Sequence, residues 1–258
     1  MLEQFVDLSR HNIKNDNYAA TCRSRLDSKG VLCLPKFLKP EVLQALVNAA
    51  AEVEKHAYFT TSTHNVYLTP KNPELPKSHV FNLQVVSTKG CVCDDIISAN
   101  SPLRHIYNNA DFKKFICQVV GVDSLFPYED PLSSINIHYA PKGKELGWHF
   151  DNSEFAITLL LQAPEAGGED HYIKDLRDAN AGEMNFEGVK AALEGRLEPT
   201  VLPIEPGTLV LFRGRNSLHR VTPTKGKISR YLVVLAYNGK PGVSLSETAR
   251  QTFYGRVV

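Results

Sequence analysis

The sequence predicts a mainly β protein with a double-stranded β-helix core, a cupin-like jelly roll, supported by helices from its N-terminal half. After residue 130 the chain consists of short apolar or alternating runs separated by turn residues, as in antiparallel sandwiches and jelly rolls. Before residue 130, two segments carry apolar residues at helical spacing. A length of 258 residues fits one large domain. We therefore expect a single domain, in which residues 1–129 support the core formed by residues 130–258.

The N-terminal half is predicted to contain one strand, two helices and a long loop. The segment at 30–38 has the composition of a short buried strand. Residues 39–57 follow with a proline near their start and apolar residues at helical spacing, and a second helix is expected over 111–121. The polar, proline-broken residues 58–79 predict a long loop with a hairpin, and loops of this length are often functional.

The C-terminal half is predicted to supply the strands of the jelly roll. An amphipathic helical insert at 183–197 interrupts them. The expected strands are SSINIHYA (133–140), GWHFD (147–151), FAITLLLQ (155–162), GEDHYI (168–173), PTVLPI (199–204), GTLVLFRG (207–214), HRVTPT (219–224) and SRYLVVLAYN (229–238).

Composition narrows the class of protein. The 29 basic and 28 acidic side chains are spread along the chain, so no surface for nucleic acid or an anionic membrane is indicated. The five cysteines form no CxxC pair, and their odd number disfavours a complete disulfide framework. No signal peptide or membrane-spanning run is visible. We expect a soluble cytoplasmic protein that binds neither nucleic acid nor membrane.

The stretch GWHFDNSEF carries the first sign of a metal site. His149 and Asp151 are two positions apart, so on a strand their side chains point to the same face. His219 follows a later strand and turn, and Arg230 heads the next apolar strand eleven residues on. Two histidines and one carboxylate on one face of an octahedral ion suit a non-heme Fe(II) oxygenase. The planar fork of an arginine suits the distal carboxylate of a metal-chelating co-substrate.

This order of residues on short strands resembles the Fe(II)/2-oxoglutarate-dependent dioxygenase superfamily. VLCLPKFLKPEVLQALVNAA is similar to its strand-then-helix opening, and INIHYAPKGKELGWHFD to the region preceding the HxD motif. FAITLLLQAPEAGGED and IEPGTLVLFRGRNSLHRVTP resemble the following strand and the distal-histidine region, so the resemblance covers residues 30–240. The phrases WHFD, GGE, SLHRVTP and TFYGR are closest to the branch of hydroxylases and halogenases that act on free amino acids.

The resemblance implies cofactors and a site. The cofactors would be Fe(II), 2-oxoglutarate and O₂, with His149, Asp151 and His219 as iron ligands and Arg230 holding the distal carboxylate of 2-oxoglutarate. Arg220 is the alternative to Arg230, but a position adjacent to His219 should point to the opposite face, as Trp148 should beside His149. Four further residues share strand faces that could reach the co-substrate: Thr158, Gln162, Asn136 and His138.

The resemblance also implies the reaction. Decarboxylation of 2-oxoglutarate to succinate and CO₂ would be coupled to oxidation of a substrate C–H bond. Halogenases of this group have a small residue in place of the carboxylate ligand, so Asp151 disfavours halogenation. Hydroxylation is the first expectation, and desaturation and ring closure remain open.

We expect the substrate to be a small molecule, specifically a free amino acid. The 58–79 loop could close over the barrel mouth as a polar lid. The candidate substrate-binding residues are His64, Asn65 and Tyr67 in that loop, Asn152 after the metal ligand, and Glu247, Arg250 and Arg256 in the tail. The alternative is a non-catalytic jelly roll that binds a metal or a small molecule. A structural zinc site would need a fourth protein ligand, for which the sequence shows no suitably spaced histidine or cysteine.

Overall fold

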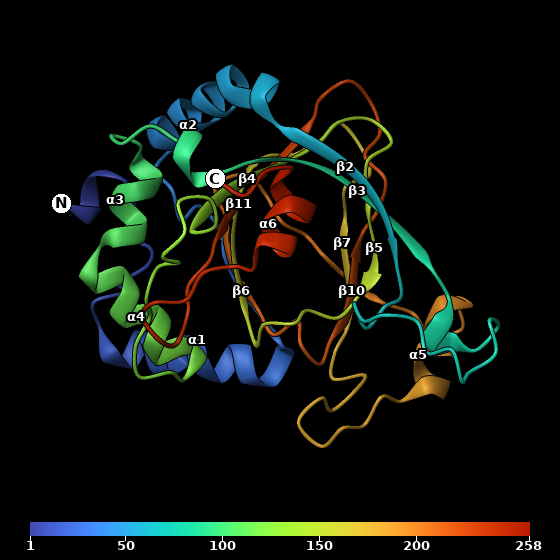
Figure 1. Ribbon diagram of the computed structural model, residues 1–258. Coiled ribbons are helices and arrows are strands. Elements are labelled where there is room, and N and C mark those ends of the chain that lie inside the picture. Colours follow the sequence, from blue (N-terminus) through green and yellow to red (C-terminus); the bar gives the residue numbers. More distant parts are fainter.

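The computed structural model describes all 258 residues, and its eleven strands form one antiparallel sheet (Figure 1). The strands are β1 (Val31–Leu34), β2 (Tyr58–His64), β3 (Val85–Val92), β4 (Ile135–Ala140), β5 (Leu146–His149), β6 (Ala156–Gln162), β7 (Asp170–Ile173), β8 (Thr200–Leu202), β9 (Leu209–Phe212), β10 (Leu218–Val221) and β11 (Arg230–Leu235). Their order in the sheet is β1-β9-β6-β11-β4-β3-β5-β10-β7-β8, with β2 paired to β3. The sheet curls into a half-barrel, which confirms the predicted jelly-roll class.

Strand β3 joins the two halves of the curled sheet. Its C-terminal end pairs with β4, where Cys91 lies opposite His138, and its middle pairs with β5, where Ser87 lies opposite Leu146. Strand β2 runs along its outer side over its full length. Because alternate side chains of β3 point inward, Ser87, Lys89 and Cys91 share the concave face.

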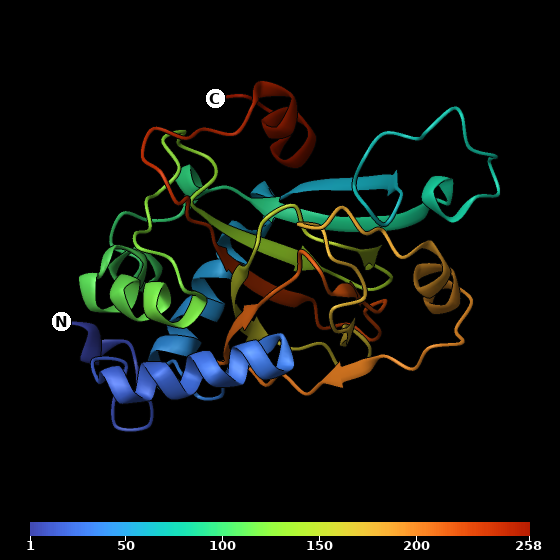
Figure 2. The same cartoon turned by 90° about the horizontal axis from the view of Figure 1, so that it is seen from below.

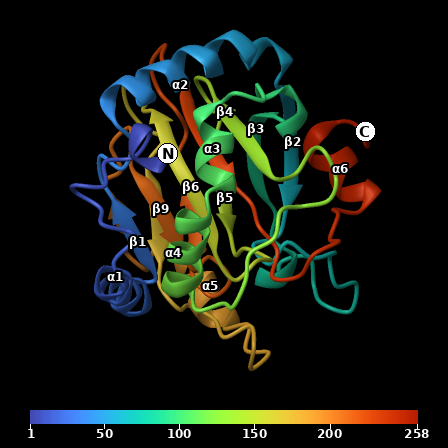
Figure 3. The ribbon, with the colours of Figure 1, turned by 90° about the vertical axis from the view of Figure 1, so that its left-hand side faces the viewer.

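Six helices surround the sheet. They are α1 (Asp16–Lys29), α2 (Pro40–Val53), α3 (Pro102–Asn108), α4 (Ala110–Val120), α5 (Phe186–Leu193) and α6 (Glu247–Tyr254). The first four lie against one face of the sheet (Figure 3), and α6 lies beside β2 and β3 (Figure 2), where Tyr254 packs against Cys91 and donates to Asn136. None of these helices combines the length and the apolar character needed to cross a bilayer.

Local sequence explains where the predicted helices begin and end. In α2, Pro40 occupies the first turn, and Val42, Leu46 and Ala50 face the core at helical spacing. The helix docks on the sheet through Tyr139, whose hydroxyl donates to the Ala50 carbonyl at 2.8 Å. Helix α4 starts at an asparagine cap, Asn109, which accepts from the Phe112 backbone N–H. These helices match the predictions for 39–57 and 111–121, and α5 matches the helical insert.

Three helices and two strands, β2 and β3, were not predicted. Helix α1 buries only Ala19, Cys22 and Leu26, so its apolar stripe is thin, and α3 has only seven residues. Helix α6, predicted only as a tail, buries Tyr254 alone. The prediction that 58–79 is a loop was wrong for its first third. Residues 58–64 form β2, whose side chains are mostly exposed and therefore polar, and the loop that follows runs to the start of β3.

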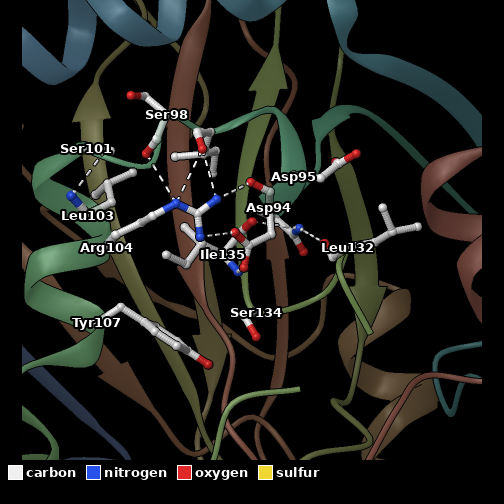
Figure 4. Close-up of polar contacts among 12 residues, drawn as sticks. Asp94, Asp95, Ser98, Ser101, Leu103, Arg104, Tyr107, Leu132, Ser134 and Ile135 are labelled. Carbon is white, nitrogen blue, oxygen red and sulfur yellow. Dashed lines mark hydrogen bonds and ion pairs between the residues drawn. The ribbon is translucent and has the colours of Figure 1, made fainter. Parts of the chain in front are cut away.

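A partly buried ion pair joins α3 to the strands beneath it (Figure 4). The Arg104 guanidinium lies 2.5 Å from Asp94 Oδ1 and donates to the carbonyls of Asp94 and Ile97 at 2.6 and 2.8 Å. The other carboxylate oxygen of Asp94 accepts from the Ile135 backbone N–H at the start of β4. Asp94 is only 8% exposed, and burial raises the pKa of its carboxyl, an effect that Arg104 opposes. The pair therefore ties the end of β3, α3 and β4 together.

Replacing Arg104 by methionine should lower the free energy of unfolding by about 2–4 kcal/mol, because the Asp94 carboxylate loses its counter-charge in a buried position. Urea denaturation followed by circular dichroism measures this. Lys114→Met, which removes the exposed ion pair with Asp16, is the control and should cost about 1 kcal/mol or less. Equal effects of the two substitutions would contradict the structural role given to Arg104.

Candidate metal centre

The pairing of β5 with β10 brings the three predicted metal ligands together. His219 lies directly opposite His149 in the strand register, and Asp151 follows two residues after β5 ends. Asp151 Oδ1 is 3.7 Å from His149 Nε2 and 3.5 Å from His219 Nε2. The three potential ligand atoms all lie within 4.8 Å of one another. The predicted triad therefore exists as a spatial cluster.

Backbone carbonyls orient both imidazole rings. The Nδ1 atom of His149 is 2.8 Å from the Gly147 carbonyl, and that of His219 is 3.0 Å from the Ser217 carbonyl. Because a carbonyl only accepts, each Nδ1 carries the proton and donates. Each Nε2 then faces Asp151, the side on which metal binding requires a free lone pair. Burial alone would lower the pKa of His219, but the Asp151 carboxylate raises it above its usual value and favours a proton on Nε2, which a bound metal would displace.

The donor set fits a divalent cation. Asp151 Oδ2 is buried without a hydrogen-bond partner, and leaving a carboxylate oxygen in that state costs free energy. Burial, aided by the nearby His219, lowers the pKa of His149 to about 3, so this ring is neutral. Burial alone would raise the pKa of the Asp151 carboxyl. The charge and hydrogen bond of His219 act in the opposite direction and hold this pKa below its usual value. A neutral imidazole and an ionised carboxylate are the states that bind metal.

The triad opens onto a cavity of about 290 Å³ between the two halves of the sheet. Of the 20 residues on its wall, 10 are hydrophobic and the others are polar or charged. Outside the triad the polar lining includes Lys89, His138, Thr158, Asp170 and Arg220. A small cavity with apolar walls and convergent polar groups is typical of sites for small molecules.

Comparisons with known proteins agree with this geometry. Residues 14–254 match the family model described as HalD, Halogenase D. The chain belongs to the Halogenase D family. No curated protein matches it in sequence.

Solved structures share the fold. The epimerase SnoN, in complex with Fe³⁺, alpha ketoglutarate and nogalamycin RO, has a TM-score of 0.59 at 11% identity, covering 90% of this chain and 93% of its own. A 2OG-Fe(II) oxygenase family oxidoreductase from Burkholderia pseudomallei has a TM-score of 0.54 at 15% identity, covering 88% and 93%. A prolyl-4-hydroxylase from Pseudomonas putida has a TM-score of 0.51 at 13% identity, covering 84% and 96%.

Membership in the Halogenase D family, together with this fold, confirms the predicted superfamily. The protein is an oxidoreductase of the Fe(II)/2-oxoglutarate oxygenase superfamily. The description of the family model, Halogenase D, agrees with the halogenase part of the branch to which the sequence motifs were closest.

The two candidate arginines have different partners. Arg230 is 5% exposed and donates from Nη2 to Asp170 Oδ2 at 2.8 Å. Arg220 places its guanidinium 4.7 Å from the centre of the Trp148 ring and donates to His171 Nδ1 at 3.4 Å. Trp148 packs with the apolar cluster outside the cavity, away from the triad as expected.

The predicted co-substrate residues divide into two groups. Thr158 and His138 line the cavity, whereas Gln162 and Asn136 do not. The Gln162 carboxamide donates to the Ser229 carbonyl at 2.8 Å. Asn136 is buried, donates to two backbone carbonyls and accepts from the Tyr254 hydroxyl at 3.1 Å. Both amides serve the fold, so we leave them out of the site.

Of the three loop residues predicted to bind substrate, one lies beside the metal centre. The His64 ring stands edge-on to His149 with centroids 6.2 Å apart, and its Nε2 is 2.7 Å from Ser87 Oγ. Asn65 is fully buried and uses its side chain to hold the turn that follows it. Tyr67 stacks between Phe81 and Phe150 and donates to a backbone carbonyl. The structure gives Asn65 and Tyr67 structural contacts in place of the predicted substrate contacts.

The remaining candidates lie outside the cavity wall. Asn152 is exposed, and its carbonyl accepts from Arg215 at 3.4 Å. Arg250 and Glu247 belong to α6, and Arg256 beyond it forms a two-pronged ion pair with Asp95 at 2.6 and 2.8 Å. These side chains attach or flank the C-terminal segment, so they do not support a substrate contact.

Sequence reasoning missed three residues of the site: Lys89, Asp170 and Gly214. Lysine and aspartate are uncommon inside apolar strands, so Lys89 in VVSTKGCV and Asp170 in the strand after the Gly-Gly turn carried a signal. Gly214 carried none, because its role depends on a contact with a distant residue.

Gly214 leaves the space that the Asp151 carboxylate occupies. A Cβ atom built on Gly214 would lie 1.8 Å from Asp151 Oδ2 and 2.5 Å from Asp151 Cγ. The Gly214 carbonyl also accepts from the Asp151 backbone N–H at 3.0 Å. Any side chain at this position would therefore displace the metal-binding carboxylate.

Gly214→Ala should weaken binding of Mn(II), used as a probe for the metal, by about 10-fold or more, because the third ligand is pushed out of position. Electron paramagnetic resonance titration of free Mn(II) measures this. Gly239→Ala is a matched control, since a Cβ there would meet no atom within 4 Å. Unchanged Mn(II) affinity in Gly214→Ala would contradict the contact described.

Proposed function

We propose that this protein uses Fe(II), 2-oxoglutarate and O₂ to oxidise a C–H bond of a small organic substrate, a free amino acid. The observation that carries the proposal is the cluster of His149, Asp151 and His219, with ligand atoms within 4.8 Å, on the wall of a small cavity. Three protein ligands leave the other positions of an octahedral ion open for a co-substrate and O₂. A closed structural zinc site would use a fourth protein ligand.

The residues of the triad have distinct tasks. His149 and His219 would hold the metal through deprotonated Nε2 atoms, with His219 losing the proton that Asp151 favours on it. Asp151 supplies the one negative charge, so the bound metal would keep a net positive charge that favours anionic oxygen ligands. When bound, Fe(II) and 2-oxoglutarate supply the oxidation, which yields succinate and CO₂ together with an oxidised substrate. The similar epimerase SnoN is described in complex with iron and alpha ketoglutarate, which supports these cofactors.

Arg230 is the proposed partner of the distal carboxylate of 2-oxoglutarate. It heads β11, its side chain is buried, and it lies on the same strand face as Leu232 and Val234, which line the cavity. The Arg220 guanidinium, in contrast, is spread over Trp148 and bonded to His171. Thr158 offers a hydroxyl on the neighbouring strand β6, where it can orient a bound carboxylate.

The cavity limits the substrate to a small molecule. A volume of about 290 Å³ must hold the co-substrate as well as the reacting part of the substrate. A free amino acid meets this limit, and the motif resemblance to the amino-acid branch favours that class. The hydroxylation of a C–H bond is the expected reaction, because Asp151 takes the coordination position that a halide would need.

A succinate-release assay tests the substrate class. Free amino acids, short peptides and carrier-bound aminoacyl groups are added singly with Fe(II), 2-oxoglutarate and O₂, and the product mass is read for each hit. A free amino acid should stimulate succinate release and gain 16 Da on hydroxylation, roughly the mass of one oxygen atom. Stimulation by peptides or carrier-bound groups with none by free amino acids would disprove the proposed substrate class.

Asp151→Ala should abolish substrate-dependent succinate release while the chain remains folded, because the metal loses its only anionic protein ligand. Circular dichroism checks the fold, and Asp178→Ala, at an exposed carboxylate in the loop before α5, is the control. Near-normal turnover by Asp151→Ala would refute the triad assignment.

A further inference from the structure

Lys89 places a cation in the cavity without an anionic partner. It lies on the concave face of β3, and it lines the cavity together with the metal triad. Its hydrogen-bond partner is His138 Nε2, 3.3 Å from Nζ. None of the ion pairs in the chain involves Lys89. An ammonium has three N–H donors, so two remain available to a ligand.

The surroundings make this cation costly to the folded chain. Burial lowers the pKa of Lys89, and burial with the charges of Lys89 and Arg230 lowers the pKa of His138 well below its usual value. His138 is therefore neutral, accepts one bond and offers no counter-charge. A buried cation without an anion destabilises a protein unless something compensates it. A bound anion at this end of the cavity would do so.

The charged groups around His138 determine how many anionic groups this end of the cavity can bind. Arg230 and Asp170 pair at 2.8 Å and cancel each other. Lys89 and Arg230 both lie near His138, since both cations lower the pKa of this imidazole and all three side chains line one pocket. Two further groups act on Lys89: the charge of Asp151, which the proposed site gives to the metal, and the Phe253 ring, whose centre lies 6.0 Å from Nζ. The group around His138 thus carries one positive charge that no ion pair balances. One carboxylate of a ligand would balance this charge. If the ligand carboxylate bound Arg230 alone, it would compete with Asp170 for the same guanidinium.

We infer that Lys89 is a second cationic anchor for the distal carboxylate of 2-oxoglutarate, which it shares with Arg230. This inference rests on the proposed function, because it assigns a residue to the co-substrate of the same site. The ammonium binds the carboxylate through its two free N–H groups, and His138 holds the ammonium in place through the third. Asp170 then keeps Arg230 oriented without having to leave it.

The test combines a change in the protein with a change in the ligand. Isothermal titration of the Mn(II)-loaded protein measures binding of 2-oxoglutarate and of 2-oxopentanoate, which has a methyl group in place of the distal carboxylate. Lys89→Met should weaken 2-oxoglutarate binding about 10-fold or more and leave 2-oxopentanoate binding within about threefold, as expected for one lost charge-assisted contact. Arg230→Met should show the same selectivity.

Two controls separate this contact from general effects. Lys142→Met removes an exposed positive charge outside the cavity and should change neither affinity. The melting temperature of Lys89→Met should equal or exceed that of the unsubstituted protein, because the substitution removes an uncompensated buried charge. A large drop in melting temperature would instead assign Lys89 to the fold and overturn the inference.

The outcomes distinguish this inference from the proposed function. If the unsubstituted protein does not prefer 2-oxoglutarate over 2-oxopentanoate, the assignment of 2-oxoglutarate as co-substrate fails. If that preference exists and Lys89→Met leaves it intact, only the inference about Lys89 fails. If Lys89→Met spares 2-oxoglutarate but raises the KM of the amino-acid substrate, Lys89 binds the substrate carboxylate and the inference is likewise wrong.

Discussion

The register between β5 and β10 is the constraint on which the site depends. Directly paired residues of an antiparallel ladder project to the same face at close range, and here the pair is His149 and His219, with ring centroids 4.1 Å apart. A shift of one residue would turn one imidazole away from the other. Asp151 completes the group because its backbone N–H is held by the Gly214 carbonyl. Sheet hydrogen bonds thus determine the metal geometry before any metal binds.

The cavity beside the metal triad depends on a second feature, the curl of the sheet. Strand β3 pairs with β4 along its end and with β5 at its middle, so it draws the two halves together. Lys89 then faces the same space as Asp170 of β7 and Thr158 of β6. On the outer face, the Arg104 network joins α3 to the end of β3 and the start of β4. The cavity is therefore a product of the whole sheet, whereas the triad needs only two neighbouring strands.

This difference explains what sequence analysis could and could not predict. The ligands His149, Asp151 and His219 follow from a period of two along a strand and from their order, which are local properties. The inward position of Lys89 requires knowing that β3 joins both halves. Tyr67 was expected at the substrate because a polar tip in a long loop is often functional, but its ring instead fills an apolar cluster. Helices α1 and α6 were not predicted because each buries few apolar residues, so neither shows a clear helical pattern in the sequence.

The contact between Gly214 and Asp151 links two positions that are far apart in the chain. A carboxylate at 151 and a side chain at 214 cannot occupy the same volume. In a chain with a small residue in place of the carboxylate ligand, the volume beside position 214 would be free, and the restriction to glycine there would be relaxed. The two positions should therefore covary among relatives. A residue larger than glycine at position 214 would mark chains that bind their metal without a carboxylate ligand.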